Sequence, residues 1–467
     1  MQTKPTTSQA DTRAAALAVV LWVAFGLVSV ALYFGHGMSM QLKSAANIHA
    51  GSQSEQAIDG AARYIELYLD SLENEGVVPF DENYRWDRIP IGEASFWAVG
   101  RDNDNQNLTE PHFDLIDESG KINLNMEDTD ALVEMLSKLL FMTPEFAAAI
   151  GDWVDEDDEV RESGAESDAY SRTDPAYVPK NGPFETIDEL RLVSGATEAL
   201  LVGEDLNRNG VLDPNEDDGD LTPPNDNGDG VLDKGLLEFV TVYSKTSTIQ
   251  TNGEPKFNIS NIGGGGGQGG QAGGASREDL IEALEERVGS GRGTEIANAI
   301  GNAPSLLQLF QNLQRSQNVT IEEFGLFDDL LTTSTNAQTG LININKASRE
   351  VIACLPQLDE GDADAIVGYR QGNQGNLNSV AWLTEALNDD EKIAAIAPFI
   401  TDKGYQFTAD ISALGRNMRG YRRSRIVFDI SEELPKIVYR RDMTREGWAL
   451  GTEIRREIAQ QKLNPPQ

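Results

Sequence analysis

The residues with the clearest chemistry lie in one twelve-residue loop, 205–216. Oxygen-bearing side chains stand at its positions 1, 3, 5, 9 and 12, with glycine at position 6, which is the pattern of an EF-hand calcium loop. Ca²⁺ takes about six to eight oxygen ligands, and this spacing wraps side-chain and backbone oxygens around one point. We therefore expect Ca²⁺ to be bound by Asp205, Asn207, Asn209, the Val211 carbonyl, Asp213 and Glu216.

A second loop follows and repeats the first five ligand positions. Its position 12 is Leu236, so a nearby acid such as Glu238 has to complete the site, or the site is weaker. A polar surface loop with glycine turns is the alternative, but it explains neither the spacing nor the recurrence. The ligands expected here are Asn225, Asn227, Asp229, the Val231 carbonyl and Asp233.

An acidic run at 152–159 is a third candidate. Asp155 and Asp157 offer oxygen ligands there, and a solvated acidic loop is an equally open interpretation. The three histidines are scattered, and the sequence contains no pattern of nucleophile, base and orienting group. We predict that the chain is not an enzyme.

The chain that carries these loops begins with a segment that can cross a membrane. Residues 14–34 hold no charge and no proline, and these 21 residues are long enough to cross a bilayer as a helix. Apolar residues then recur at three- and four-residue spacing as far as Leu72, which predicts an amphipathic continuation. Lys4 and Arg13 place the preceding tail in the cytoplasm. We expect a leader at 1–14, a transmembrane helix at 15–35 and a stalk helix at 36–75.

The composition limits the partners of the body. Acidic residues number 76 against 38 basic ones, so a net charge of −38 argues against nucleic acid or anionic lipid. Divalent cations are the natural counter-ions. The single cysteine, Cys354, cannot form an internal disulfide and lies in an apolar segment, where we expect a small buried side chain.

The remaining chain predicts an α+β fold with inserted helical repeats. Strands are expected at 94–101 and 111–116, within a pilin-like segment 76–119 packed on the stalk. Alternating residues predict strands across the C-terminal segment 403–467, whose thirteen basic and eight acidic residues face either the acidic middle or a partner subunit. Between them lie a first repeat (120–200), the calcium-loop segment (201–240), a second helical segment (241–338) with a glycine-rich linker (263–275), and a last repeat (339–402).

The repeats resemble helix-hairpin-helix (SAM-like) modules, because each begins with an I-N-x-N or similar segment followed by short helices. Such modules often bind nucleic-acid backbones through glycine-rich hairpins. The corresponding hairpin here, 355–364, is acidic and would repel phosphate. We therefore expect a packing or protein-docking role.

Several blocks, taken in order, resemble the K subunit of type II secretion pseudopilins. They are the apolar N-terminal helix, D-E-S-G-K-I-N-L-N at 117–125, the D-W-x-D-x-D and G-A-E-x-x-Y blocks at 152–170, the I-N-I-N block and the final strands. In pseudopilins a prepilin peptidase cuts before the apolar helix. The matching residues are Ala14, where the family usually has Gly, and Ala15, which becomes the first mature residue. Most pseudopilins carry Glu at the fifth mature position, whereas this chain has Val19, and that absence is a feature of the K subunit.

The resemblance implies a structural function. It implies a minor pseudopilin at the tip of the pseudopilus, acting in its assembly and in protein export. The implied partners are the I and J minor pseudopilins and prepilin peptidase, with secreted substrate left open and no nucleic acid. It also implies a single-pass inner-membrane protein with its body in the periplasm and with bound calcium. The alternative is a membrane-anchored helix-hairpin-helix receptor for DNA uptake.

Overall fold

A computed structural model describes residues 9–72, 76–78, 86–103, 110–219, 221–250, 252–262, 276–432 and 434–463. Residues 1–8 of the predicted leader and the predicted glycine-rich linker 263–275 lie outside the described residues. The backbone of Ala14 is helical, and Ala15 is the first residue whose side chain is described.

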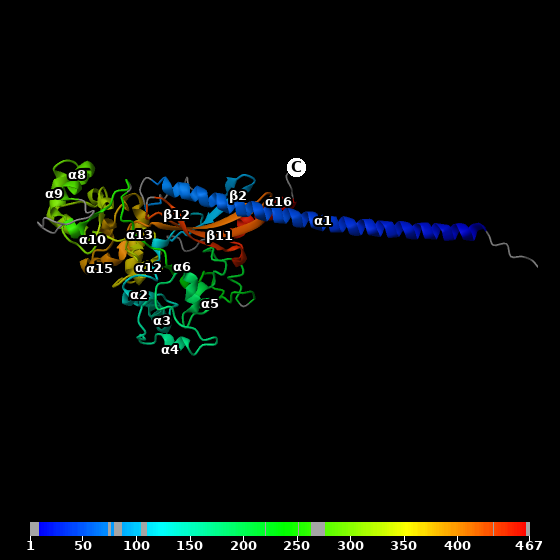
Figure 1. Ribbon diagram of the computed structural model, residues 1–467, viewed down its shortest axis with the longest axis horizontal. Helices are drawn as coiled ribbons and strands as arrows, with labels where there is room; N and C mark the ends of the chain where they lie inside the picture. Colours follow the sequence, from blue (N-terminus) through cyan, green and yellow to red (C-terminus); the bar gives the residue numbers. More distant parts are fainter. Residues whose placement is uncertain are drawn as a thin grey trace, which may run out of the picture.

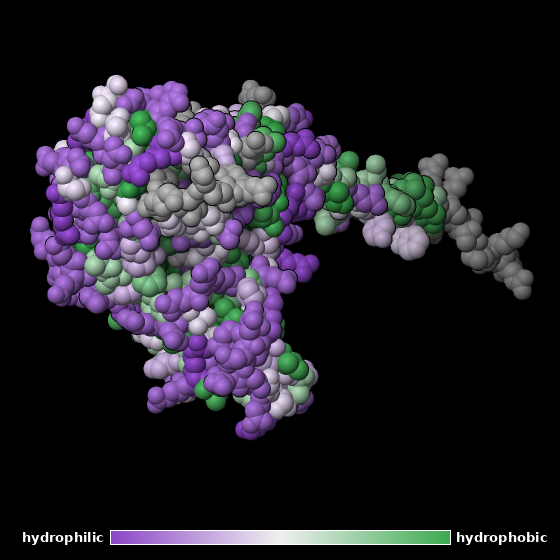
Figure 2. Space-filling model, turned by 60° about the vertical axis from the view of Figure 1, so that its left-hand side comes forward, coloured by the Kyte–Doolittle hydropathy of each residue, from purple (hydrophilic) through white to green (hydrophobic). Residues whose placement is uncertain are grey.

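One continuous helix, α1 (Gln9–Asp70), forms the predicted span and stalk. Its side chains from residue 15 to residue 49 are exposed, and burial begins at Ala50. The helix is long and apolar enough to cross a membrane. Figure 1 shows its N-terminal half projecting from the body, and Figure 2 shows apolar residues gathered on that projecting part.

The second half of α1 packs on an antiparallel sheet. Within the described residues the strand order is β1 (Ile89–Ile91), β2 (Ala94–Val99), β10 (Gln406–Gly415), β11 (Arg419–Asp429) and β12 (Lys436–Asp442). A short strand, β3 (Ile116–Asp117), also pairs with β10. The strands predicted at 94–101 and in 405–442 are confirmed.

Two parts of the strand prediction are wrong. Residues 111–116 contribute only an isolated bridge from Phe113 to Val99 before β3 begins. The segment 403–467 does not remain extended, because the chain ends in α16 (Gly451–Leu463). Ile454 and Ile458 stand four residues apart there, so they share one helix face against the sheet.

Alternation along β10 gives the sheet two different faces. Phe407, Ala409, Ile411 and Ala413 are buried in the core that α1 covers. The residues between them, such as Asp410, point to the opposite face because successive side chains of a strand alternate. One face of the sheet is therefore apolar and binds α1, whereas the other is polar.

Two glycines let the β10–β11 hairpin close around α1. A Cβ at Gly415 would lie 2.6 Å from the Ala50 carbonyl oxygen, and one at Gly420 would lie 2.3 Å from the Ala50 carbonyl carbon. Gly420 also has a positive φ of 71°. These contacts require glycine and mark the level at which α1 enters the body.

The inserted body shows three segments that share one plan within the described residues. Each opens with an apolar residue followed by Asn, and each closes with a parallel two-residue ladder: β4 (Ile122–Asn123) with β5 (Val240–Thr241), β6 (Phe257–Asn258) with β7 (Leu331–Thr332), and β8 (Ile342–Asn343) with β9 (Ile400–Thr401). The sequence pattern for the middle segment is the faintest of the three, yet its ladder matches the others.

Short helices fill each segment. The first holds α2 (Thr129–Ser137), α3 (Pro144–Val154), α4 (Ser167–Tyr170), α5 (Glu198–Val202) and α6 (Leu236–Phe239). The middle one holds α7 (Ile259–Ile262), α8 (Arg277–Val288), α9 (Arg292–Ala299), α10 (Leu306–Gln317) and α11 (Ile321–Phe324). The last holds α12 (Arg349–Cys354), α13 (Glu360–Gly372), α14 (Leu383–Ala386) and α15 (Asp390–Ile396).

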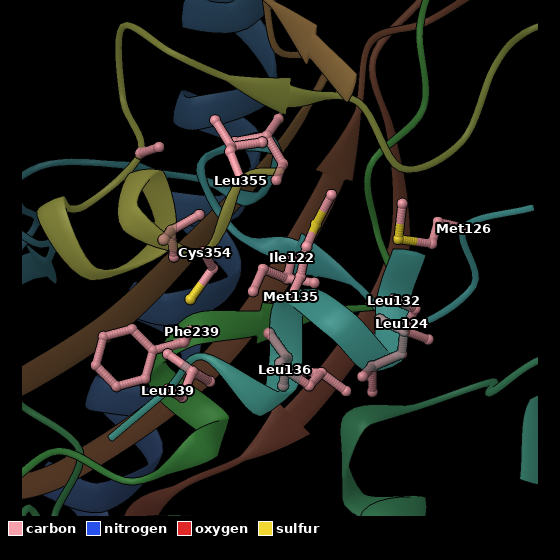
Figure 3. Close-up of a cluster of buried hydrophobic side chains, with 14 of the residues drawn as sticks. Ile122, Leu124, Met126, Leu132, Met135, Leu136, Leu139, Phe239, Cys354 and Leu355 are labelled. Atoms are coloured by element: carbon pink, nitrogen blue, oxygen red, sulfur yellow. The ribbon is translucent and has the colours of Figure 1, made fainter. Parts of the chain in front are cut away.

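The first and last segments share one hydrophobic core, whereas the middle segment has its own. Figure 3 shows Cys354 and Leu355 of the last segment beside Met135 and Leu139 of the first. Burial raises the pKa of the Cys354 thiol to about 12, so this thiol stays protonated. The prediction that Cys354 is a small buried side chain is confirmed.

Candidate metal centres

The first loop, residues 205–216, lies between α5 and α6 and is largely buried. The side chains of Asp205, Asn207, Asn209, Asp213 and Glu216 are all buried there. Asp205 Oδ2 accepts a hydrogen bond from Gly210 N at 2.8 Å, which fixes the sharp turn. Glu216 folds back over the loop, accepting from Leu206 N at 3.1 Å and from Asp213 N at 3.0 Å. The loop thus closes on its own twelfth residue.

Three carboxyl groups are buried together in the first loop. Burial, and next the charge of Asp205, raise the pKa of Glu216 to about 8. Burial also raises the pKa of Asp205 and of Asp213. Burying like charges is costly unless a cation neutralises them. This set of hard oxygen donors fits a divalent cation such as Ca²⁺.

The second loop, residues 225–236, repeats the hydrogen bonds of the first at an exposed position. Asn227 Oδ1 accepts from Asp229 N at 2.8 Å, and Asp229 Oδ1 accepts from Val231 N at 2.8 Å. The amide of Asn227 donates to Asp233 at 3.1 Å, as the amide of Asn207 donates to Asp213 in the first loop. The residues at the predicted ligand positions 3, 5, 7 and 9 of the second loop therefore lie close together: Asn227, Asp229, Val231 and Asp233.

Glu204, and not Glu238, closes the second loop. Glu204 accepts from Asn227 N at 3.3 Å and from Asp233 N at 3.0 Å, which is the role that Glu216 has toward Asp213 in the first loop. The predicted substitute Glu238 instead forms an ion pair with Arg101. Because Glu204 directly precedes Asp205, the two loops interlock.

Position 1 of the second loop also differs from the prediction. Gly230 N donates to Asp217 Oδ1 at 3.1 Å, as Gly210 N donates to Asp205. Asn225, the predicted first ligand, is exposed, and within the described part of the chain no hydrogen bond joins its side chain to the loop. Asp217 therefore takes toward Gly230 the place that Asp205 takes toward Gly210 in the first loop.

A glycine makes this interlocking possible. Gly203 forms an isolated antiparallel β-bridge with Lys234, and Glu204 N donates to the Asp233 carbonyl at 2.8 Å. A Cβ at Gly203 would lie 2.2 Å from the Asp233 carbonyl oxygen, and its φ is +67°. Only glycine fits this crossing.

A buried arginine anchors the first loop on the polar face of the sheet. Arg423 of β11 pairs with Asp410 of β10, with Nε and Nη2 lying 2.6 and 2.7 Å from the carboxylate oxygens. The same guanidinium donates to the carbonyls of Asn207 and Arg208, the latter at 3.0 Å. Burial alone would raise the pKa of Asp410, but Arg423 and Arg425 hold it well below its ordinary range.

The acidic run predicted as a weaker candidate brings three carboxylate side chains together. Ligand atoms of Asp155, Asp157 and Glu166 all lie within 4.8 Å of one another, and no other group of three such side chains does so among the described residues. Both carboxylate oxygens of Glu166 and Oδ1 of Asp155 are buried without a hydrogen-bond partner in the described chain. Burial, with Asp152 next, raises the pKa of Glu166 to about 7. These orphaned oxygens fit a cation.

Glu166 of this cluster and the neighbouring Asn181 were not predicted as site residues. Glu166 belongs to the G-A-E block, and Asn181 lies in the P-K-N-G segment further along the chain. Asn181 donates to the Asp157 carbonyl, and its own Oδ1 is buried without a partner among the described residues. Glu166 lies in a block that resembles the family, whereas only the fold brings Asn181 to Asp157.

Residues 113–202 match the family model of the type II secretion system (T2SS), protein K. The matched part includes β3, α2–α5 and the acidic cluster, whereas the two loops lie beyond its end.

The type II secretion system protein K of Klebsiella pneumoniae is 33% identical over 84 residues, which is 18% of this chain. The aligned part spans 26% of that relative's length. A chain in the crystal structure of the GspK-GspI-GspJ complex from the enterotoxigenic Escherichia coli type 2 secretion system aligns over 87% of this chain and 99% of its own length. It does so at 11% identity and a TM-score of 0.34.

Proposed function

We propose that this protein is a minor pseudopilin of the type II secretion system, acting in pseudopilus assembly and in protein export. The observation that carries the proposal is the union, in one chain, of a match to the protein K family model with an N-terminal apolar helix packed on a small antiparallel sheet. It is also supported by the order of the sequence blocks on both sides of the matched part.

The shape of the molecule supports a place at the fibre tip. Figure 1 shows the whole body gathered at one end of α1, with the apolar half of the helix projecting alone. Subunits that stack through such helices leave little room above a body of this size. We infer that this subunit caps the pseudopilus, with α1 in the inner membrane and the body in the periplasm.

The I and J minor pseudopilins are the proposed partners. Beyond the expected span, α1 exposes Met38, Leu42 and Ile48 before it enters the body, and Ile48 is 72% exposed. Met38 and Leu42 stand four residues apart and so share one face of the helix, which a neighbouring helix can cover. Prepilin peptidase is the proposed processing enzyme.

Processing is tested on the full chain recovered from membranes with active or inactivated prepilin peptidase. A first residue of Ala15 that depends on the active peptidase is the expected result. Ala14→Gly should be cut at least as well, because the family usually has Gly there. An intact N-terminus in both membranes, for both the natural chain and Ala14→Gly, would contradict the pseudopilin assignment.

Partner binding is tested by co-purifying the full chain with the I and J subunits of the same secretion system. Leu42→Asp should reduce their capture, because it places a charge on the exposed stretch of α1. Leu326→Asp is the matched control, since Leu326 is half exposed on the middle segment. Equal losses in both variants would argue against α1 as the contact.

The repeats are proposed to be helix-hairpin-helix-like docking modules that do not bind nucleic acid. In the last segment Asp359 caps α13 by accepting from Asp362 N at 3.0 Å. Asp362 in turn pairs with Lys392 at 2.6 Å. A capped, acidic helix start offers phosphate neither free amides nor positive charge. Retention of the full chain on immobilised duplex DNA at physiological salt would overturn this part of the proposal.

Calcium is proposed to hold the inserted body rigid rather than to take part in a reaction. The first loop, the second loop and the acidic cluster are the three proposed sites. Equilibrium dialysis of the full chain in detergent against radioactive calcium counts them. Glu216→Gln, Glu204→Gln and Glu166→Gln should each reduce the bound calcium, whereas Glu156→Gln, an exposed neighbour of the cluster, should not.

A further inference from the structure

A small cavity lies where the first loop meets the polar face of the sheet. Its volume is about 20 Å³, enough for one water-sized particle. Residues of the sheet, of the first helical segment and of the first loop line it. The charged lining comprises four cations, Lys121, Arg208, Arg425 and Arg441, and two carboxylates, Glu118 and Asp188.

Three of these cations are paired with carboxylates. Arg425 lies 2.8 Å from Asp410, which it shares with Arg423, and Lys121 lies 3.2 Å from Glu118. Arg441 lies 2.7 Å from Glu446 and also pairs with Asp188. Each of these three cations therefore has a carboxylate partner.

Arg208 is the exception. Its side chain forms no ion pair or hydrogen bond with the described residues, although only 7% of the residue is exposed. The loop backbone holds it in place, because Arg423 and Arg101 both donate to the Arg208 carbonyl at 3.0 Å. A buried guanidinium that lacks an anion is unfavourable.

We propose that this cavity binds a single small anion of the size of chloride, with Arg208 as its counter-charge. The ion completes a wall in which every other cation already has a carboxylate. The volume excludes phosphate esters and nucleotides. Because the chain carries a net charge of −38, long-range repulsion opposes anion binding, so any bound anion must be held by this local site. The proposal does not depend on the pseudopilin function.

The direct test is ³⁵Cl NMR on the full chain in detergent at constant calcium and ionic strength. A bound chloride that exchanges with solvent broadens the chloride signal, and we expect this broadening with the natural chain. Arg208→Met keeps the length of the side chain and should remove most of the broadening. Arg172→Met is the matched control, since Arg172 is an exposed arginine, and it should leave the broadening unchanged.

A second measurement separates loss of binding from loss of folding. Thermal unfolding is followed while gluconate, which is too large for the cavity, replaces chloride. The natural chain and Arg208→Lys should unfold at a higher temperature in chloride, whereas Arg208→Met should unfold at the same temperature in both salts. Arg208→Met should be no less stable than the natural chain in gluconate, because it removes a buried unpaired charge. Broadening that survives in Arg208→Met, or equal salt responses of the natural chain and Arg208→Met, would overturn the proposal.

Discussion

The two loops share one ligand pattern but differ in what completes it and in where they lie. The first loop is buried, closes on its own Glu216 and is fixed to the sheet by Arg423. The second loop is exposed and takes Glu204 and Asp217 from outside its own twelve residues. A short motif therefore locates a loop reliably, whereas the fold decides which residues complete it.

This difference predicts separate roles. The first loop connects to the polar face of the sheet, so its state should affect the pilin-like half of the molecule. The second loop contacts the first through Glu204 and should depend on it more than the reverse. Substitutions that act on one loop but not on the other can test this distinction.

The largest effect is expected from Arg423→Met. The change leaves Asp410 with Arg425 alone and removes the donor for the carbonyls of Asn207 and Arg208. Breaking a buried ion pair costs about 3–5 kcal/mol. Hydrogen exchange should show this loss of protection for amides of β10 and β11 together with the first loop.

The control for this prediction is Arg172→Met, which removes an exposed pair with Asp168. Exposed pairs contribute about 0–1 kcal/mol, so protection of the sheet should be unchanged. If Arg423→Met loosened the first loop but left the sheet protected, the loop and the sheet would be independent.

The next effect is expected from Glu216→Gln. Glu216 accepts two backbone amides and supplies the twelfth ligand position of the first loop. Losing a residue that supports a metal ligand lowers affinity roughly 10–100-fold, and losing a ligand itself should cost at least as much. Calcium titration of the full chain should show that the binding step of the first loop, the tighter of the two loop sites, is lost. The acidic cluster at Glu166 should keep its calcium.

A smaller and more selective effect is expected from Glu204→Gln. It should weaken calcium binding roughly tenfold at the second loop and leave the first loop close to its natural affinity. Glu238→Gln is the discriminating control, because the sequence pattern alone places Glu238 at this site, whereas the structure pairs it with Arg101. Loss of second-loop calcium in Glu238→Gln but not in Glu204→Gln would favour the sequence interpretation.

Sequence reasoning succeeded where the signal is local. The apolar helix, the alternation of β10 and the first loop all follow from spacing within one segment. The faint middle repeat also shows in the sequence as apolar-Asn at Phe257–Asn258. Each of these features is determined by neighbouring residues, so tertiary contacts were not needed to find it.

It failed where distant segments meet. Glu204 lies 29 residues before Asp233, and Glu166 comes from a different block than Asp155, so spacing within a loop could not join them. The C-terminal helix α16 was missed because the alternating strands before it were extended past Asp442. Nothing in the periodicity marked Arg423 as an anchor, since alternating arginines usually form a solvated face.

A further expected effect is a pH dependence of stability and calcium binding at the first loop. In the ion-free fold the pKa of Glu216 is raised from 4.5 to about 8, so the folded state holds a proton there that the unfolded chain has released. Ion-free stability should therefore fall as the pH rises from 4.5 toward 8 and level off above it. Calcium needs the ionised carboxylate and must displace this proton, so its affinity should rise about tenfold per pH unit until roughly pH 8.

Calcium titrations between pH 6 and 9 measure this dependence, and proton release measured by calorimetry in two buffers checks its origin. Glu216→Gln lacks this proton. The calcium binding that remains at the second loop therefore shows how much of the change in affinity with pH comes from the first loop. If the calcium affinity of Glu216→Gln still rises with pH, the proton belongs to the interlocking Glu204. Burial raises the pKa of Glu204 as well. The two loops would then titrate as one unit, and the separation argued from their burial would fail.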